Sequence, residues 1–303
     1  MAFHADRLPF PTASDRRAAL FRETPRQMVE RWVMGAAWAM KPPRHKMLPA
    51  LAKLWLTDLM APDAALPDPE ADLGDGLCGI VHDLSVATIV AASERGLYPF
   101  AHCGPIKWWS PAQRALLYFN EFHISKRMRG YIRSGRYRVT FDRDIEAVMK
   151  ACAAPRPGKL HVTWITPKIM RAYAEAFDAG LVHCFEVWDE ANELVGGGYG
   201  VALGGTFIIE SQFSRDPSAS KVGFSTLNYH LAQWGFVFAD NKRMTPTVRD
   251  LGFREVPRAQ FLRELEAAVR MPGKTGHWMV EADAATVAAW QPGGIESKKH
   301  EAA

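Results

Sequence analysis

The order of elements between residues 182 and 240 constrains the fold more than any other feature of this chain. Three short β-type runs at 182–188, 193–202 and 206–210 are separated by short polar or glycine-rich turns, which is typical of an antiparallel meander. A helix is expected over 219–234, followed by an apolar strand over 236–239 that ends at Asp240. The pattern predicts a mixed α/β (α+β) domain that combines a sheet with packed helices.

The rest of the chain reads mostly as helices. Ser85 is expected to cap a helix, and Gly96 suits the left-handed position that closes it. Ser110-Pro111 has the form of a helix start, which predicts a helix over 111–117. Further helices are expected at 26–40, 44–60, 86–95, near 143–152, over 168–178 before Gly180, and from Ser125 onward.

A stretch rich in Pro, Asp and Gly at 61–76 favours turns and marks a boundary. We therefore expect a helical extension and acidic linker at 1–72, a small N-terminal domain at 73–115, a larger domain at 116–290 and a disordered tail at 291–303. Trp32, Trp38 and Trp55 give the extension large apolar surfaces. These surfaces pack on the rest of the protein, form an RNA-contacting arm, or meet a membrane or a protein partner.

Membrane and secretion classes are disfavoured. The longest uncharged apolar stretch near the N-terminus, Val33 to Met40, falls far short of the roughly 20 residues that cross a bilayer. Asp6 and Glu23 argue against a signal peptide, so no transmembrane segment and a cytoplasmic location are expected.

The cysteines favour neither disulfides nor metal binding. Cys78, Cys103, Cys152 and Cys184 are widely spaced, with no Cys-x-x-Cys and no nearby His pair. We expect reduced, mostly buried thiols and no metal site.

Charge is sorted along the chain, although the net charge is only +4. Residues 61–76 hold five acids and no base, whereas 107–143 hold nine Lys or Arg against two acids. A polyanion would be attracted to the second of these segments, because each phosphate contact releases counterions.

Several short sequence motifs along the chain resemble those of a known family. They are Gly96-Leu97-Tyr98-Pro99-Phe100, Ile106-Lys107-Trp108-Trp109-Ser110-Pro111, Phe122-His123-Ile124-Ser125-Lys126, Thr163-Trp164-Ile165-Thr166, Phe185-Glu186-Val187-Trp188, Glu210-Ser211-Gln212-Phe213-Ser214 and Asp240. Over roughly residues 73–270 the chain resembles the leucyl/phenylalanyl-tRNA–protein transferases, which move an amino acid from tRNA onto a protein N-terminus. The resemblance implies an acetyltransferase-like (GNAT-like) fold for the C-terminal domain and two partners, an aminoacyl-tRNA and an acceptor protein or peptide N-terminus.

The donor in such a reaction is an activated ester, so no ATP, metal or other cofactor is required. A free α-amino group has a pKa near 7.7–8.0, so a sizeable neutral fraction exists at physiological pH, and positioning supplies much of the rate. By resemblance, Asp240 orients the reacting amine, and Glu210 holds the aminoacyl-adenosine end. The competing interpretations are a turn-capping Asp and a structural Glu ion pair.

Lys242 departs from the family. The family's Asp-x-Gln motif reads Asp240-Asn241-Lys242 here, which replaces a neutral amide with a cation. Lys242 would stabilise an oxyanion or lower the pKa of the incoming amine, and it would repel a cationic N-terminal Arg or Lys. A solvent-pointing Lys242 without a role is the alternative.

The substrate side-chain pocket is altered too. Gly198 and Gln212 stand where the family commonly has methionines, and Ser211 is taken as a further substrate contact. Leu227 and Leu231 match the pocket's aromatic wall. We expect a partly apolar pocket that is roomier on one side and favours a polar or larger amino acid, because burying the Gln212 amide beside Leu would leave it unpaired.

Aromatic and basic residues predict the RNA contacts. One indole of Trp108 or Trp109 is expected to stack on the terminal adenine, with a core role as the alternative. A basic patch is expected to contact the tRNA acceptor arm, or else to be a solvated face; it comprises Lys126, Arg127, Arg129, Arg133 and Arg136.

Three other functions remain open at this point. The first is transfer from tRNA to a small-molecule amine, which Lys242 and the changed pocket motivate. The second is a non-catalytic aminoacyl-tRNA-binding protein. The third, an acyl-CoA transferase, is disfavoured because residues 214–220 lack the glycines of a pyrophosphate-binding loop.

Overall fold

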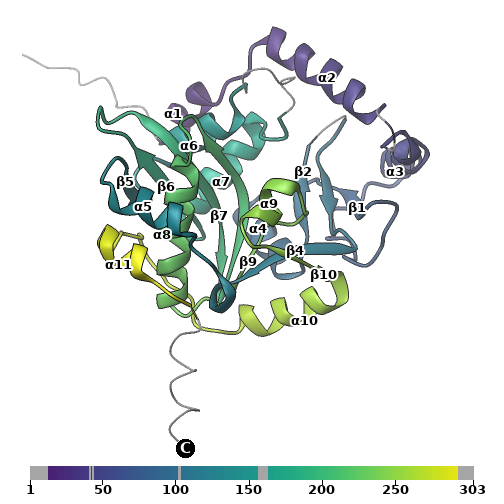
Figure 1. The fold of residues 1–303 in the computed structure, drawn as a ribbon. Coiled ribbons are helices and arrows are strands. Elements are labelled where there is room, and N and C mark those ends of the chain that lie inside the picture. Colours follow the sequence, from purple (N-terminus) through teal and green to yellow (C-terminus); the bar gives the residue numbers. More distant parts are fainter. Residues whose placement is uncertain (1–12, 41, 43, 102–103, 156–162, 293–303) are drawn as a thin grey trace, which may run out of the picture.

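Two β-sheets organise the chain in the computed structural model, which describes residues 13–40, 42, 44–101, 104–155 and 163–292 (Figure 1). The larger sheet has seven strands in the order β10-β4-β9-β8-β7-β6-β5, and the smaller has three in the order β1-β3-β2. The large sheet comprises β4 (Gln113–Tyr118), β5 (Arg138–Phe141), β6 (Val182–Trp188), β7 (Leu194–Leu203), β8 (Thr206–Ser214), β9 (Phe238–Asp240) and β10 (Arg254–Pro257). The small sheet comprises β1 (Leu77–Ile80), β2 (Tyr98–Phe100) and β3 (Lys107–Trp109).

Helices cover both faces of the large sheet. Alternate residues of β6 separate the two cores: Val182 and Cys184 pack in one cluster with α6 and α7, whereas Phe185 and Val187 pack in another with α8. The helices outside the N-terminal extension are α4 (Val86–Glu94), α5 (Lys126–Arg133), α6 (Ile145–Ala153), α7 (Pro167–Asp178), α8 (Ala219–Gln233), α9 (Pro246–Asp250), α10 (Arg258–Val269) and α11 (Ala284–Ala289), with a 3₁₀ turn η2 (Phe119–Glu121).

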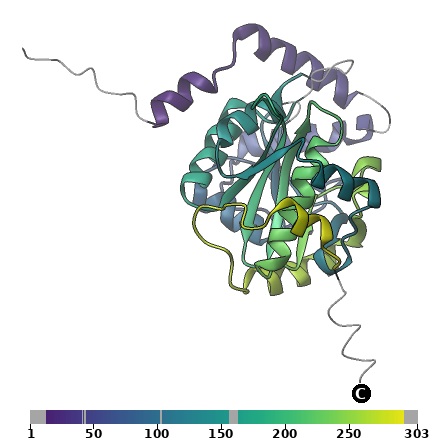
Figure 2. The same ribbon diagram turned by 60° about the vertical axis from the view of Figure 1, so that its left-hand side comes forward.

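The N-terminal extension is helical, as expected. It comprises α1 (Ala13–Leu20), α2 (Pro25–Ala39), the 3₁₀ turn η1 (Arg44–Met47) and α3 (Leu48–Met60). In the views of Figures 1 and 2, α1 and α2 cross the top of the molecule, outside the sheets. Phe21 is buried, whereas Trp32 and several apolar side chains of α2 and α3 are exposed, so packing covers only part of the apolar surface.

Most elements expected from the sequence are confirmed. β6, β7 and β8 form the antiparallel meander, and α8 follows it. Ser85 accepts a hydrogen bond from the Thr88 amide at the start of α4, and Gly96 after that helix has φ +73°. No described helix is both long enough and apolar enough to span a membrane.

The helix expected over 111–117 is wrong, because this segment is strand β4. It pairs with β9 on one side and β10 on the other. Leu116 and Leu117 are both buried but belong to different clusters, so the apolar run serves two faces of an internal strand. The Ser110 hydroxyl makes no hydrogen bond with any described residue, so it caps nothing.

Two sequence expectations fall partly or wholly outside the described residues. The tail from Gln291 onward is described only to residue 292. The described cysteines Cys78, Cys152 and Cys184 are buried, as expected, and Cys103 is not described.

Candidate active site

The candidate site lies where two parallel strands separate. β8 pairs with β9 only from Thr206↔Phe238 to Ile208↔Asp240. Beyond that register, β8 continues toward Glu210, whereas the chain after β9 turns away at Lys242, which has φ +66°. The side chains of Glu210 and Lys242 meet in the opening between the two chains.

In this opening the Lys242 side chain supplies the hydrogen-bond donor that a neighbouring strand would otherwise give to β8. Its Nζ donates a hydrogen bond to the Ile209 carbonyl at 2.8 Å and lies 2.6 Å from Glu210 Oε2. The two side chains are 9% and 1% exposed. Burial lowers the pKa of Lys242, and the Glu210 charge opposes that shift. The alternative of a solvent-pointing Lys242 is therefore wrong.

Asp240 is fully buried at the end of β9. Its carboxylate accepts two hydrogen bonds from the Arg114 guanidinium, and it accepts the Lys242 backbone N–H at 2.7 Å. Arg114 also donates to the Gly96 carbonyl at 2.8 Å and lies over the Phe261 ring at 4.1 Å. Asp240 therefore stabilises the turn that positions Lys242, and it does not itself line the cavity described next.

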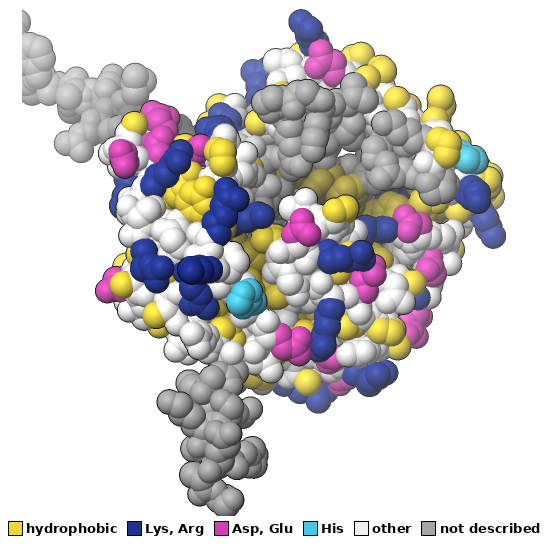
Figure 3. Space-filling view, viewed as in Figure 1, with side chains coloured by type: hydrophobic (Ala, Val, Ile, Leu, Met, Phe, Trp, Pro, Cys, Tyr) yellow, Lys and Arg dark blue, Asp and Glu magenta, His cyan; other side chains and the backbone are white. Residues whose placement is uncertain are grey.

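A cavity of about 370 Å³ opens in front of the Glu210–Lys242 pair, and we call it the reaction pocket. Its walls come from β2, the segment before α7, the end of β8 and the chain from 241 to 251. They comprise Tyr98, Phe100, Trp164, Ile209, Glu210, Ser211, Gln212, Asn241, Lys242, Arg243, Thr245, Thr247, Val248 and Leu251. Phe100 and Trp164 stack with ring centroids 5.3 Å apart, and Lys242 Nζ lies 5.2 Å from the Tyr98 ring centroid. Figure 3 shows hydrophobic side chains in a hollow near the middle of this face.

The pocket wall contains three charged residues, Glu210, Lys242 and Arg243, and several aromatic faces. Aromatic faces suit an adenine or an apolar side chain, and a carboxylate beside them suits a cationic amine. The described residues contain no group of His, Cys, Asp or Glu that could hold a metal ion.

Trp108 and Trp109 lie in the small sheet and are both buried. Trp108 belongs to the large core cluster, and Trp109 packs with Leu77 and Tyr98. Neither indole lines the described reaction pocket. Tyr98, Phe100 and Trp164 line it instead. They stand in the motifs that carried the resemblance but were not predicted as site residues. Arg114 was missed because no motif contains it.

Gly198 does not open the pocket as expected. A Cβ there would lie 2.6 Å from Gln212 Cγ, 2.8 Å from Phe185 Cε1 and 2.9 Å from the Ser211 carbonyl. The space left by the absent side chain is filled, so the extra room expected on this side is not present. Gln212 and Ser211 do line the reaction pocket, and the Gln212 amide makes no hydrogen bond with any described residue.

Leu227 and Leu231 lie within the core cluster of α8 and are almost fully buried. They are not among the residues that line the described pocket. Their expected part in the pocket wall is therefore at most indirect, through the strands that α8 supports.

The predicted basic patch lies on and after α5, where Figure 3 shows basic side chains at the lower left. Lys126 and Arg133 are exposed and make no ion pair with described residues, whereas Arg136 pairs with Asp216 at 2.8 Å. Arg129 donates hydrogen bonds to the Ile124 and Ala288 carbonyls and so helps to hold α11. Arg127 donates to the Tyr131 hydroxyl. The patch is exposed except for the half-buried Arg129, and its RNA contact stays a prediction.

The sheets and the reaction pocket together define a mixed α/β protein whose candidate site lies at the separation of two parallel strands. Residues 116–266 match the family model described as leucyl/phenylalanyl-tRNA protein transferase. A protein named leucyl/phenylalanyl-tRNA–protein transferase from Alkalilimnicola ehrlichii is 38% identical over 239 residues, which cover 78% of this chain and 92% of that protein. One of the same name from Azotobacter vinelandii is 40% identical over 227 residues, which cover 74% and 99%. The chain therefore belongs to the leucyl/phenylalanyl-tRNA–protein transferase family, a family of enzymes.

Solved structures give weaker likenesses. A functionally unknown conserved protein from Staphylococcus epidermidis has a TM-score of 0.33 at 9% identity, covering 59% of this chain and 67% of that one. L-PGS from Bacillus licheniformis has a TM-score of 0.28 at 12% identity, covering 51% and 49%. Scores this low support no conclusion about the fold, so the acetyltransferase-like assignment stays a prediction.

Proposed function

We propose that the protein transfers an amino acid from aminoacyl-tRNA to the α-amino group of a protein or peptide at the reaction pocket. Family membership supports the reaction class. The observation that carries the assignment to this pocket is the buried Glu210–Lys242 pair beside Tyr98, Phe100 and Trp164. These groups match the needs of an aminoacyl-adenosine end, which has a flat base, an ester and a cationic α-amino group.

The chemistry needs no added oxidant or energy source. The acceptor amine attacks the ester carbonyl carbon, the bond from that carbon to the ribose oxygen breaks, and the amine proton passes to the departing oxygen. Glu210 attracts and orients the amine. Lys242, held by Glu210 and the Ile209 carbonyl, presents positive charge to the oxygen that becomes negative in the transition state. Asp240 acts through the turn and not by contact with the substrate, since Arg114 and the Lys242 amide occupy its carboxylate.

The paired state of Lys242 bears on the acceptor. Glu210 compensates the Lys242 charge at 2.6 Å, which removes most of the repulsion that an isolated cation would exert on an N-terminal Arg or Lys. Cationic N-termini are therefore suitable acceptors. No feature of the pocket favours a small-molecule amine over a peptide.

Gln212 bears on the donor. Its amide, which bonds none of the described residues, offers both a donor and an acceptor to the transferred side chain at the pocket wall. We infer that the enzyme prefers to transfer an amino acid whose side chain hydrogen-bonds this amide, and that leucine is a poorer donor residue. Transfer rates with a panel of charged tRNAs test it, and a clear preference for leucyl- and phenylalanyl-tRNA would overturn this part alone.

The main experiment incubates the protein with phenylalanyl- or leucyl-tRNA and a peptide that begins with Arg, with the N-acetylated peptide as control. Mass spectrometry should show one added residue on the free peptide and none on the acetylated one. Tight binding of charged tRNA without transfer to any acceptor would favour the non-catalytic RNA-binding function instead.

The layout of the chain follows the same proposal. We assign residues 73–115 to a small N-terminal domain and 116–290 to an acetyltransferase-like catalytic domain. The parallel β8–β9 pair that parts at the pocket supports the second assignment. A cytoplasmic location is proposed because charged tRNA is the donor.

A further inference from the structure

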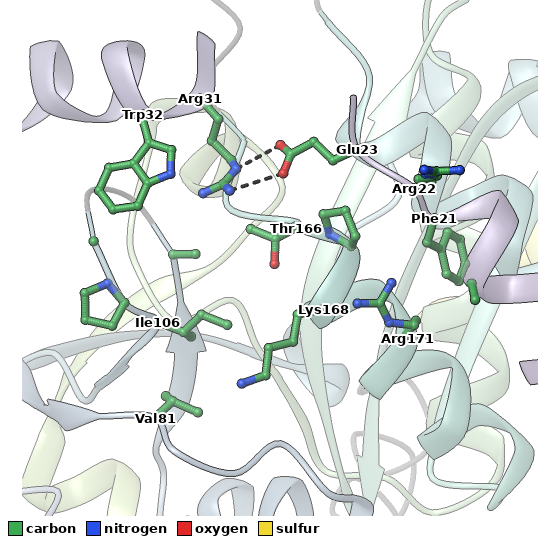
Figure 4. Close-up of a pocket in the computed structure, with 15 residues that line it drawn as sticks. Phe21, Arg22, Glu23, Arg31, Trp32, Val81, Ile106, Thr166, Lys168 and Arg171 are labelled. Atoms are coloured by element: carbon green, nitrogen blue, oxygen red, sulfur yellow. Dashed lines mark hydrogen bonds and ion pairs between the residues drawn. The ribbon is translucent and has the colours of Figure 1, made fainter. Parts of the chain in front are cut away.

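A second cavity lies between the N-terminal extension and the rest of the protein. It measures about 550 Å³, and we call it the extension cavity (Figure 4). Its walls include Arg22, Arg31 and Trp32 from the extension, and Thr166, Lys168 and Arg171 from the start of α7. Figure 4 shows Trp32 and the Arg31–Glu23 pair across the cavity from Lys168 and Arg171. Arg22, Arg31 and Trp32 lie outside the residues matched by the family model.

The extension is fixed where it forms this cavity. Arg17 pairs with Glu146 on α6 at 2.9 Å and with Asp178 at the end of α7. Phe21 is 1% exposed in the large core cluster. These contacts hold the backbone on the N-terminal side of Arg22, so the cavity is formed before any ligand arrives.

Three cations at the cavity have no counter-charge within the part of the chain that the structure describes. The one lining acid, Glu23, already pairs with Arg31 at 2.9 Å. Arg22, Lys168 and Arg171 make no ion pair or side-chain hydrogen bond with any described residue. A preformed concavity lined by three uncompensated cations attracts anionic groups.

The cavity also offers a flat apolar surface. Trp32 is 49% exposed at its wall, and Val81 and Ile106 contribute apolar area. Cations combined with an accessible indole favour a single-stranded nucleic acid over a bare anion, because the phosphates and one base find partners together.

The extension cavity and the reaction pocket share two chain segments as walls. Phe100 lines the reaction pocket, and its neighbour Ala101 lines the extension cavity. Trp164 lines the reaction pocket, and Thr166, two residues further, lines the extension cavity. An RNA whose terminal adenosine occupies the reaction pocket therefore has its preceding nucleotides close to the extension cavity.

From this arrangement we propose that the extension cavity binds phosphate groups of the single-stranded RNA segment that precedes the terminal adenosine, with Arg22, Lys168 and Arg171 as the cations and Trp32 as a stacking surface. The proposal rests on the proposed function, since it takes the 3′ end of the same RNA to be in the reaction pocket. It assigns the extension a part in donor binding.

The test compares two donors in the full-length protein. Phenylalanyl-tRNA carries the phosphates, whereas 3′-phenylalanyl-adenosine carries none. The double variant Lys168→Ala/Arg171→Ala should raise KM for the tRNA donor about tenfold or more and leave the rate with the adenosine donor within twofold. The matched control Lys53→Ala/Arg263→Ala removes two exposed cations that line neither cavity and should change neither donor.

Salt dependence provides the second readout. Each lost contact to a single-stranded phosphate lowers the slope of log affinity against log salt by about 0.7, so the double variant should lose about 1.4. Trp32→Ala should weaken tRNA binding about fivefold or more without changing the slope. Thermal unfolding of each variant checks that the fold is intact.

The outcomes separate the two proposals. If the wild type transfers from both donors and the double variant behaves like its control, the extension cavity is not an RNA site, and the proposed function stands. If the wild type transfers from neither donor, the proposed function fails first. If AMP or inorganic phosphate binds at the extension cavity as tightly as an RNA oligonucleotide ending in CCA, the site takes free phosphates, and the RNA proposal is overturned.

Discussion

Lys242 and Glu210 form a buried ion pair, so replacing either residue alone leaves the charge of the other without a partner. Removing one partner of a buried pair leaves an uncompensated charge, which destabilises by about 3–5 kcal/mol. Lys242→Met should lower the free energy of unfolding by that amount, whereas Lys242→Gln keeps donors for Glu210 and the Ile209 carbonyl and should lose less.

Urea unfolding measures both variants of Lys242. The double variant Lys242→Met/Glu210→Gln is the control, because it removes both charges and should recover part of the loss. Equal effects of the Met and Gln variants, with no recovery in the double variant, would show that the pair does not stabilise the fold.

Gly198 replaces a larger family residue, yet its neighbours fill the space that a side chain would take. Gly198→Ala forces a Cβ against Phe185 and the Ser211 carbonyl as well as Gln212, so overpacking should destabilise the protein by about 1–3 kcal/mol.

The matched control for Gly198 is Gly130→Ala in α5, where a Cβ meets nothing within 4 Å. There the substitution should be neutral or stabilise by up to about 1 kcal/mol, since Ala favours the helix. Thermal unfolding distinguishes the two glycines, and equal midpoints would contradict the crowding at Gly198.

Single residues were the hardest part of this molecule to predict. The motifs around Asp240, Glu210 and Lys242 pointed to residues that lie together in the structure, and Glu210 and Lys242 line one pocket. The sequence did not reveal which aromatic side chains line the pocket, because β3 buries Trp108 and Trp109 in two different clusters on opposite faces of the small sheet. The pairing of Asp240 with Arg114 joins positions 126 residues apart, and no local pattern announces it.

At the scale of elements, His230 of α8 binds the backbone of the segment after α10. His230 Nδ1 lies 2.8 Å from the Thr226 carbonyl, and Nε2 accepts the backbone N–H groups of Glu281 and Ala282 at 2.9 and 3.2 Å. The ring is therefore neutral. Burial lowers the pKa of His230 below its usual 6.5, with Lys274 acting in the same direction and Glu281 opposing it.

This geometry predicts acid sensitivity. A lowered folded pKa means that the contribution of His230 to stability is fully present above about pH 6.5 and declines as pH falls toward and through the folded pKa. Unfolding free energies measured between pH 5 and 8 should fall on the acid side. His230→Gln should flatten that dependence, whereas His123→Gln, at an exposed position, should preserve it. An unchanged pH profile in His230→Gln would rule out this histidine as the cause.

Elements with local signals were predictable from the sequence. The caps at Ser85 and Ser125 mark the starts of α4 and α5, and short β-type runs separated by polar or glycine-rich turns mark β6, β7 and β8. β4 was misread because Ser110-Pro111 has the form of a helix start, while the partners that make the segment a strand, β9 and β10, lie more than a hundred residues later.

At the scale of the whole molecule, α1 depends on Arg17 for its attachment. Arg17→Ala removes contacts to Glu146 and Asp178, so amides from Arg17 to Ala39 should exchange with deuterium about tenfold faster, a change of about 1.4 kcal/mol.

The control for Arg17 is Arg26→Ala. Arg26 pairs with Glu30 on the exposed surface of α2, where such a pair contributes little. Exchange should be unchanged in that variant. Equal exchange in both variants would mean that the apolar contacts around Phe21 hold the extension without the ion pairs.

Two chain segments line both the reaction pocket and the extension cavity, so a ligand bound in one can change the affinity of the other for its ligand. If a ligand in one cavity changes the affinity of the other cavity by some factor, the second ligand changes the affinity of the first by the same factor. This follows because both orders of binding end in the same doubly bound state. An acceptor analogue that raises the affinity for the RNA would therefore itself bind more tightly, by the same factor, when the RNA is bound, and a two-ligand titration would measure that factor.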